Sequence, residues 1–190
     1  STKAITDRLG NDGYAFANVN AVPEIDRSKR TVAFTLFIDP GRRVYVRRIN
    51  VAGNTRTRDE VVRREMRQIE GGWYSADKIT KSKQRVDRLG YFTDVSVETP
   101  SVAGTTDQVD VNMTVVEKPT GTLQLGAGYS SFEKLFLTFG IQQDNIFGTG
   151  NYLGTQISTS KYNQVLTVNF TDPYFTDDGV SRTIDFYHRS

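Results

Sequence analysis

Residues 107–129, DQVDVNMTVVEKPTGTLQLGAGY, join two regions of different character. Before Pro119, valines alternate with polar residues, which is typical of a strand with one buried face. After Pro119, glycines, leucines and a tyrosine replace the charged residues. The stretch therefore predicts that one kind of structure ends and another begins close to Pro119.

The same change in composition extends over the whole chain of 190 residues. Residues 1–118 hold 20 of the 24 Lys and Arg and 16 of the 22 Asp and Glu, whereas residues 119–190 hold 12 of the 21 aromatic residues. Because lipid-exposed charge is costly, weakly charged strands separated by Gly, Asn and Asp turns indicate a membrane-facing β segment. A soluble all-β domain is the alternative interpretation.

Several classes of function are disfavoured. The net charge of +2 comes from interspersed acidic and basic residues, so we expect no nucleic acid partner. The chain has no cysteine for disulfides or thiolate sites, and no apolar run reaches the ~20 residues of a membrane helix. The single histidine, His188, lacks companions at metal-ligand spacing. We therefore predict no enzyme, no catalytic residue, no metal and no cofactor.

A repeat organises the first region. The sequence DRLG at residues 7–10 recurs at residues 87–90, and its final glycine predicts the end of a helix in both copies. Two strands follow each time, over residues 18–22 and 31–38 and over residues 95–99 and 109–116. A proline, Pro40 or Pro119, ends each copy.

Only the second copy is complete. It begins with a strand over residues 43–51, and Thr57 then predicts the start of a helix on which Val62, Met66 and Ile69 share one face. After two glycines, Ser75 predicts the cap of a second helix. The predicted order is β-α-α-β-β, and the shorter first copy suggests a fragment of a longer protein.

Four longer stretches resemble the BamA family of POTRA-bearing outer-membrane barrel proteins: VVRREMRQIEG at 61–71, RLGYF at 88–92, QQDNIFGTG at 142–150 and DPYFTDDGV at 172–180. The resemblance implies the end of one POTRA domain at residues 1–39, a complete POTRA domain at 42–118 and the first strands of a barrel at 120–190. The expected fold class is thus α+β POTRA domains followed by the antiparallel strands of an incomplete transmembrane β-barrel.

Five strands are predicted in the second region, over residues 121–129, 135–143, 152–160, 162–170 and 182–187. Most approach the ~9–11 residues that cross a bilayer at barrel tilt. In the first strand, Leu123, Leu125, Ala127 and Tyr129 form one face, and glycine and glutamine form much of the other. An odd set of five strands cannot close a bacterial barrel, so we expect an open sheet.

The first of these strands is the candidate binding site. Glycine weakens pairing inside a strand, and an opened strand edge offers unpaired N–H and C=O groups to an incoming strand. The resemblance implies that nascent outer-membrane β-barrel proteins are folded and inserted at this lateral gate, in the outer membrane and against its lipid. The candidate residues are Gly121, Thr122, Leu123, Gln124, Leu125, Gly126, Ala127, Gly128 and Tyr129. Alternatively, the glycines only relieve crowding or allow curvature.

A second candidate surface consists of Arg64, Arg67 and Glu70, close to Trp73. Mixed charges beside an exposed aromatic residue suit a protein interface. The resemblance implies that this surface meets BamD, one of the lipoproteins of the assembly machinery, with the POTRA domains in the periplasm. The alternative is a solvated helix face beside a core tryptophan.

Two other functions stay open for the whole chain. One is a POTRA-barrel transporter of the TamA-like or two-partner secretion type. The other is a soluble periplasmic module that binds proteins.

Overall fold

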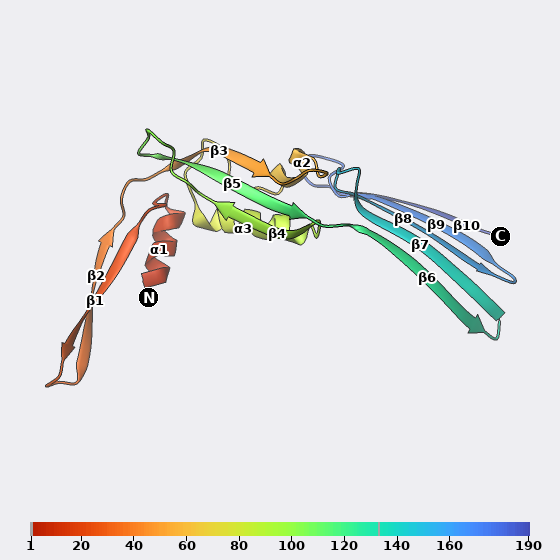
Figure 1. The fold of residues 1–190 in the computed structure, drawn as a ribbon, viewed down its shortest axis with the longest axis horizontal. Helices are drawn as coiled ribbons and strands as arrows, with labels where there is room; N and C mark the ends of the chain where they lie inside the picture. Colours follow the sequence, from red (N-terminus) through yellow and green to blue (C-terminus); the bar gives the residue numbers. More distant parts are fainter. Residues whose placement is uncertain (1, 133) are drawn as a thin grey trace. The chain divides into compact units, whose positions relative to one another are not determined.

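The computed structural model describes residues 2–132 and 134–190, which divide into two compact units (Figure 1). The first unit contains residues 2–53, 62–89 and 94–116. The second contains residues 117–132 and 134–190 together with two short segments, 54–61 and 90–93. Each unit is described separately below.

The first unit opens with helix α1 (Thr2–Asn11) and a hairpin of antiparallel strands, β1 (Asn18–Asp26) and β2 (Thr31–Asp39). The prediction that Gly10 ends the helix is wrong, because α1 continues to Asn11 and the left-handed residue is Gly13, at φ 102°. Gly10 instead lies where a Cβ would come within 3.2 Å of Ala76 Cβ. This glycine therefore permits the close approach of α1 to α3.

The second repeat has the predicted β-α-α-β-β order. It consists of β3 (Tyr45–Ala52), α2 (Asp59–Arg63), α3 (Ala76–Arg88), β4 (Phe92–Glu98) and β5 (Gln108–Glu117). The three strands form one sheet in the order β3-β5-β4, and β3 runs parallel to β5.

Alternation along the central strand β5 creates the core of this unit. Val109, Val111, Met113 and Val115 are buried, while their neighbours are more exposed. The core is completed by Val46 and Ile49 of β3, by Val44 just before it and by Ile79 of α3, with the strands on one side and α3 on the other (Figure 1). Full burial of each such side chain is worth about 1.5–3 kcal/mol, so this apolar layer is the main source of stability in the unit.

The helix predicted after Thr57 is much shorter than expected. Although it starts near Thr57, α2 ends at Arg63, and Ile69 is 64% exposed instead of sharing a buried face. The backbone N–H groups of Arg67 and Gln68 donate to the Ser82 hydroxyl on α3. Since these donors have a long-range acceptor, the segment does not need helical hydrogen bonds of its own.

Helix α3 follows its sequence signals. Ser75 is the N-cap, and its hydroxyl accepts a hydrogen bond from the backbone of Lys78. The predicted glycine signal at the other end is confirmed, because Gly90 has φ 74°, a conformation that glycine adopts at little cost.

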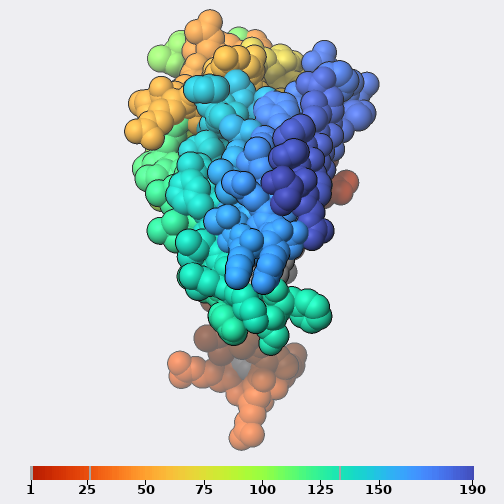
Figure 2. Space-filling view, turned by 90° about the vertical axis from the view of Figure 1, so that its right-hand side faces the viewer, coloured from red at the N-terminus to blue at the C-terminus, as the bar shows by residue number. Residues whose placement is uncertain are grey.

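The second unit is a five-stranded antiparallel sheet. Its strands are β6 (Gly121–Ser130), β7 (Lys134–Ile146), β8 (Asn151–Ser160), β9 (Gln164–Asp172) and β10 (Arg182–Arg189), in the order β10-β9-β8-β7-β6. Figure 2 shows strands following one another across this unit, from teal to dark blue. All five predicted strands are present, although β9 starts two residues late because Ser160 and Asn163 close a tight turn. Among the described residues, no helix is both long enough and apolar enough to cross a membrane.

Candidate functional site

Strand β6 lies at one end of the sheet order, so only one of its two edges is paired. That edge pairs with β7 over the full length of the strand, from Gly121 opposite Gln143 to Ser130 opposite Lys134. Within the described residues, no strand pairs with the other edge. The predicted gate strand is therefore one of the two end strands of this sheet, with β10 at the other end.

The strand register places unlike chemistry on the two faces of the sheet. On one face, Leu125 faces Phe139, which in turn faces Ile157 on β8. The rows on either side are apolar on β6 and β7 and end in threonine on β8. On the other face, Gln124 lies beside Gly140 and Gln156. The apolar side chains are exposed at this face, with Leu125 81% and Leu123 70% exposed. This is the apolar and polar alternation expected of a barrel wall.

The glycines of β6 have different surroundings. A Cβ on Gly128 would lie 2.3 Å from the ring of Phe136 on the facing strand, so the ring occupies the space that a side chain would need. A Cβ on Gly126 would meet only Thr138, at an ordinary 3.7 Å. An aromatic ring over a strand glycine stabilises the sheet locally, which favours the packing interpretation for Gly128 alone.

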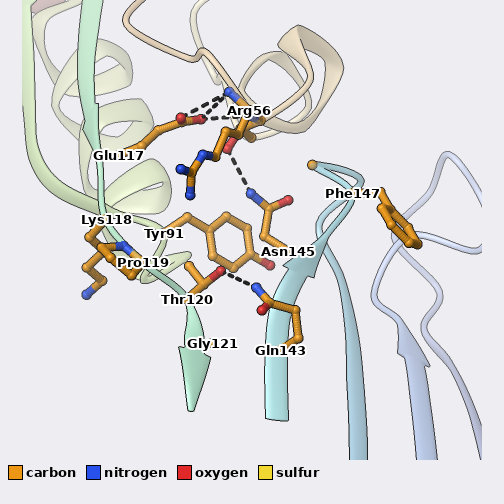
Figure 3. A pocket seen from close by; sticks show the side chains of 12 residues that line it. Arg56, Tyr91, Glu117, Lys118, Pro119, Thr120, Gly121, Gln143, Asn145 and Phe147 are labelled. Carbon is orange, nitrogen blue, oxygen red and sulfur yellow. Dashed lines mark hydrogen bonds between the residues drawn. The ribbon is translucent and has the colours of Figure 1, made fainter. Parts of the chain in front are cut away.

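A carboxylate organises the base of this strand. Glu117, four residues before Gly121, accepts hydrogen bonds from the backbone N–H of Thr57 at 2.7 Å and of Arg56 at 3.0 Å. Its second oxygen also accepts from the Thr55 hydroxyl at 2.8 Å. The carboxylate thus holds three consecutive residues of the loop before α2. Figure 3 shows Glu117 bonded to the backbone at Arg56.

The turn between β7 and β8 is attached to the same loop. Asn145 Nδ2 donates to the Thr57 hydroxyl at 2.8 Å, and Asn145 Oδ1 accepts from the backbone of Gly150 at 2.8 Å. Gly148 accepts from the backbone N–H of Arg58 at 2.9 Å. We call Thr55, Arg56, Thr57, Glu117 and Asn145 the loop clamp.

The backbone of this turn is strained. Asn145 and Phe147 have φ values of 54° and 53°, in the left-handed region that residues other than glycine rarely occupy. Gly148 fits because it has no side chain: a Cβ there would lie 1.9 Å from the carbonyl oxygen of Arg56. Such strain is retained where surrounding contacts hold it, and here the loop clamp supplies them.

A cleft of about 660 Å³ opens between the loop clamp and the first residues of β6. Figure 3 shows Tyr91 and Asn145 inside it, with Gln143 donating to the Thr120 hydroxyl. The Tyr91 hydroxyl donates to the carbonyl oxygen of Gly150 at 3.1 Å. Thr120, the residue before β6, is therefore held to β7 by the Gln143 side chain.

The surroundings of Glu117 favour the ionised form of its carboxyl group. Burial acts to raise the pKa of this carboxyl, but hydrogen bonds from Thr57, Thr55 and Arg56 outweigh it, so the pKa lies below the ordinary 4.5. The side chain is therefore a carboxylate at neutral pH.

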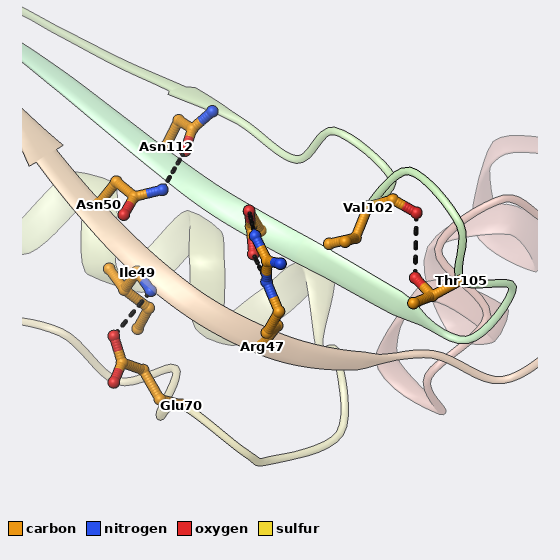
Figure 4. A network of polar contacts seen from close by, with 8 residues as sticks. Arg47, Ile49, Asn50, Glu70, Val102, Thr105 and Asn112 are labelled. Carbon is orange, nitrogen blue, oxygen red and sulfur yellow. Dashed lines mark hydrogen bonds and ion pairs between the residues drawn. The ribbon is translucent and has the colours of Figure 1, made fainter.

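The second candidate surface lies in the first unit, and its three residues have different environments. Glu70 is exposed but accepts a hydrogen bond from the backbone N–H of Ile49 at 2.8 Å and pairs with Arg63 at 3.5 Å (Figure 4). Arg64 is half-buried, whereas Arg67 is exposed. Glu70 thus has a structural contact that the sequence did not indicate.

Trp73 is 53% exposed, which rules out the alternative of a core tryptophan. The guanidinium of Arg43 lies 4.4 Å from the centre of its ring, a cation–π contact. An exposed aromatic side chain thus lies close in sequence to Glu70, as a protein interface would require.

A further polar contact stabilises the sheet beside Glu70. Arg47 on β3 forms two hydrogen bonds to Asp110 on the adjacent β5, at 2.9 and 2.5 Å (Figure 4). The side-chain hydrogen bond from Arg47 lowers the pKa of Asp110. The imperfect apolar alternation of β3 has another cause, because its register with β5 shifts by one residue between Val46 and Arg48.

Sequence reasoning missed the loop clamp. Glu117 and Thr57 are 60 residues apart, and nothing local shows that they meet. The available signal was a glutamate at the end of a valine-rich strand, where a solvated residue is the usual interpretation.

Two family descriptions match the chain. The POTRA family, described as a surface antigen variable number repeat, matches residues 1–41 and 44–118. The Omp85 superfamily domain matches residues 145–190.

Relatives and solved structures agree with these matches. The chain is 45% identical over 98% of its length to the outer membrane protein assembly factor BamA of Neisseria meningitidis serogroup B, and it covers 23% of that protein. The structure of Haemophilus ducreyi BamA lacking POTRA domains 1–3 superposes with a TM-score of 0.89 at 38% identity, covering 99% of this chain and 35% of that one. CdiB from Escherichia coli, at 18% identity and a TM-score of 0.53 over 91% of this chain and 32% of its own, shares the fold alone.

The chain spans about a quarter of the length of the Neisseria relative, and it carries both the POTRA repeats and part of the Omp85 domain. The similarity to CdiB is weaker, because CdiB is less than half as identical to this chain as the Neisseria protein. The chain therefore belongs to the BamA family of POTRA and Omp85 proteins.

Proposed function

We propose that this chain is part of an assembly factor that folds and inserts β-barrel proteins into the outer membrane, and that β6 is the template strand. In this proposal, residues 1–39 end one POTRA domain, 42–118 form the last one and 120–190 begin the barrel. The POTRA domains lie in the periplasm, and the apolar sheet face contacts lipid. The work is strand pairing without catalysis.

The observation that carries the proposal is that β6 is an end strand of the sheet and contains three glycines, Gly121, Gly126 and Gly128, which weaken strand pairing. An unpaired strand edge recruits another strand through its backbone groups, and binding of this kind tolerates varied side chains. An assembly factor must accept many client sequences, so backbone recognition suits the task. The Neisseria relative is named as an assembly factor, which favours this reading of the edge over a purely structural one.

The test is photo-crosslinking in the full-length parent protein during assembly of a client barrel. Photoreactive residues are placed one at a time from Thr122 to Tyr129, and a matched position in the centre of the sheet, Ser158 on β8, serves as control. We expect crosslinks to the terminal strand of the client at alternate β6 positions and none at Ser158, whose strand is paired on both sides. An active parent with no β6 crosslink would refute the template role.

We also propose that Arg64, Arg67 and Glu70 contact the lipoprotein BamD and its associated lipoproteins. Mixed charges near the exposed Trp73 support this surface. Because Glu70 also accepts from Ile49, a Glu70→Lys variant would disturb β3 as well as the surface. Arg67→Glu is the cleaner change, since the Arg67 side chain is exposed. Retention of the lipoprotein by the Arg67→Glu variant would count against its assignment.

A further inference from the structure

One face of α3 carries a stripe of basic residues that the proposed function does not use. Lys78, Lys81, Arg85 and Arg88 recur at intervals of three and four residues, so they lie on the same side of the helix. Over ten residues of helix, the stripe is about 15 Å long. Arg67, from the segment before α3, adds a further cation beside it.

The stripe lines a hollow. Together with Asp77 and Gln84, these five basic residues surround a groove of about 600 Å³. A groove of this size admits several side chains of a partner. We call it the basic groove.

Most of the charge in the basic groove is available to a partner. Asp77 pairs with Lys81 at 2.7 Å, and the buried Glu65 pairs with Arg85 at 2.7 Å. Across the part of the chain that the structure describes, no carboxylate lies within ion-pair distance of Arg67, Lys78 or Arg88, and all three are exposed. The groove therefore presents three cations without an internal counter-charge.

Helix stability does not explain this arrangement. Cations stabilise the last turn of a helix, which accounts for Arg85 and Arg88, but Lys78 lies in the first turn, where the helix dipole disfavours positive charge. Like charges three or four residues apart also destabilise a helix, by about 0.2–0.5 kcal/mol per pair. The stripe is thus retained at some cost to the isolated helix.

We propose that the basic groove binds an acidic segment of another protein, in extended conformation. Alternate side chains of an extended chain recur about every 6.6–7 Å on one side, so two or three carboxylates match a stripe of about 15 Å. A bilayer surface is a poorer match, because a flat surface does not enter a hollow. Arg67 also belongs to the proposed BamD surface, so the inference rests on Lys78 and Arg88 of α3.

The test measures binding of the detergent-solubilised full chain to a fluorescent eight-residue peptide of alternating Glu and Ser. The groove variant is Lys78→Glu with Arg88→Glu, and the matched control is Lys83→Glu. Lys83 is an exposed residue of the same helix, about 140° around it from Lys78 and outside the groove. A Gln and Ser peptide and phosphatidylglycerol vesicles are the comparison ligands.

We expect the Glu peptide to bind with an affinity that falls as salt rises, and the groove variant to weaken that binding at least fivefold. Lys83→Glu should change it less than twofold, and circular dichroism should show both variants folded. A neutral pair, Lys78→Gln with Arg88→Gln, replaces the reversal if folding is lost. Equal weakening by Lys83→Glu, no preference over the Gln peptide, or binding to vesicles alone would overturn the proposal. None of these outcomes bears on the β6 crosslinks.

Discussion

Replacing Glu117 by Gln tests whether the loop clamp is held by a carboxylate. The substitution keeps the shape of the side chain but leaves one acceptor oxygen and adds an NH₂ group. In the protein, one oxygen accepts from Thr57 N at 2.7 Å and the other from the Thr55 hydroxyl at 2.8 Å, with Arg56 N shared between them. If the amide oxygen stays on Thr57 N and Arg56 N, the NH₂ group faces the Thr55 hydroxyl, which must then accept instead of donate, and every remaining hydrogen bond loses its charged acceptor.

The expected magnitude follows from these contacts. A hydrogen bond to a charged group contributes about 1.5–3 kcal/mol, and water can partly replace it at the exposed Arg56. We therefore expect the loop clamp to lose about 2 kcal/mol, which corresponds to about a 30-fold change in its opening equilibrium.

Hydrogen exchange of the Arg56 and Thr57 amides measures this opening directly, because both amides donate to the carboxylate. The control is Glu98→Gln, an exposed glutamate at the end of β4 that carries the same charge change. We expect about 30-fold faster exchange in Glu117→Gln and no change in Glu98→Gln. Unaltered protection in Glu117→Gln would refute the clamp.

The pH dependence supplies an independent check. Because the folded pKa of Glu117 is lowered below the ordinary 4.5, its contribution is fully present above that value and is lost as pH falls through the folded pKa. After correction for intrinsic exchange, the parent should lose protection at the Arg56 and Thr57 amides in this acid range. The Gln variant should show no such step, and a parent without one would contradict the assignment.

Two paired glycine substitutions test close contacts in the second unit. Gly148→Ala should lower the free energy of unfolding by at least about 2 kcal/mol more than Gly104→Ala, as measured by thermal unfolding. Both glycines have positive φ, but only at Gly148 would a Cβ lie against Arg56. Equal effects of the two substitutions would contradict this reasoning. Gly128→Val should speed amide exchange along β6 and cost about 1–3 kcal/mol of stability, because it displaces the facing aromatic ring. Gly126→Val should have less effect, because a Cβ there meets only an ordinary contact. A larger effect of Gly126→Val would show that the ring does not occupy the space at Gly128.

Strands were predicted well from the sequence because alternation is a local property. The β5 pattern around Val111 and the β6 pattern around Leu125 each set both the element and its faces. The ends of strands were predicted less accurately. At β9, for example, Asn163 takes part in a turn that the sequence analysis had placed inside the strand. The parallel pairing of β3 with β5 was not predicted, because the two strands are far apart in the sequence and alternation does not show which strands pair.

Long-range polar contacts explain most of what was missed. Helix α2 ends early because Ser82, on another helix, takes the hydrogen bonds of the following segment. Gln68 is 1% exposed and accepts from the backbone of Ser75, so an apparently solvated position is interior. The candidate β6 strand was found from its glycines, whereas the clamp at its base depends on a glutamate that meets its partners only after folding.

The two unlike faces of the β6 sheet restrict how any further strand can join it. A shift of one residue exchanges the faces and would place polar groups in the row of Leu125, whereas a shift of two residues restores the match. Permitted alignments are therefore separated by steps of about 6.8 Å. The edge therefore requires apolar residues at alternate positions of an added strand but hardly selects among them. One short strand can then pair with many unrelated sequences.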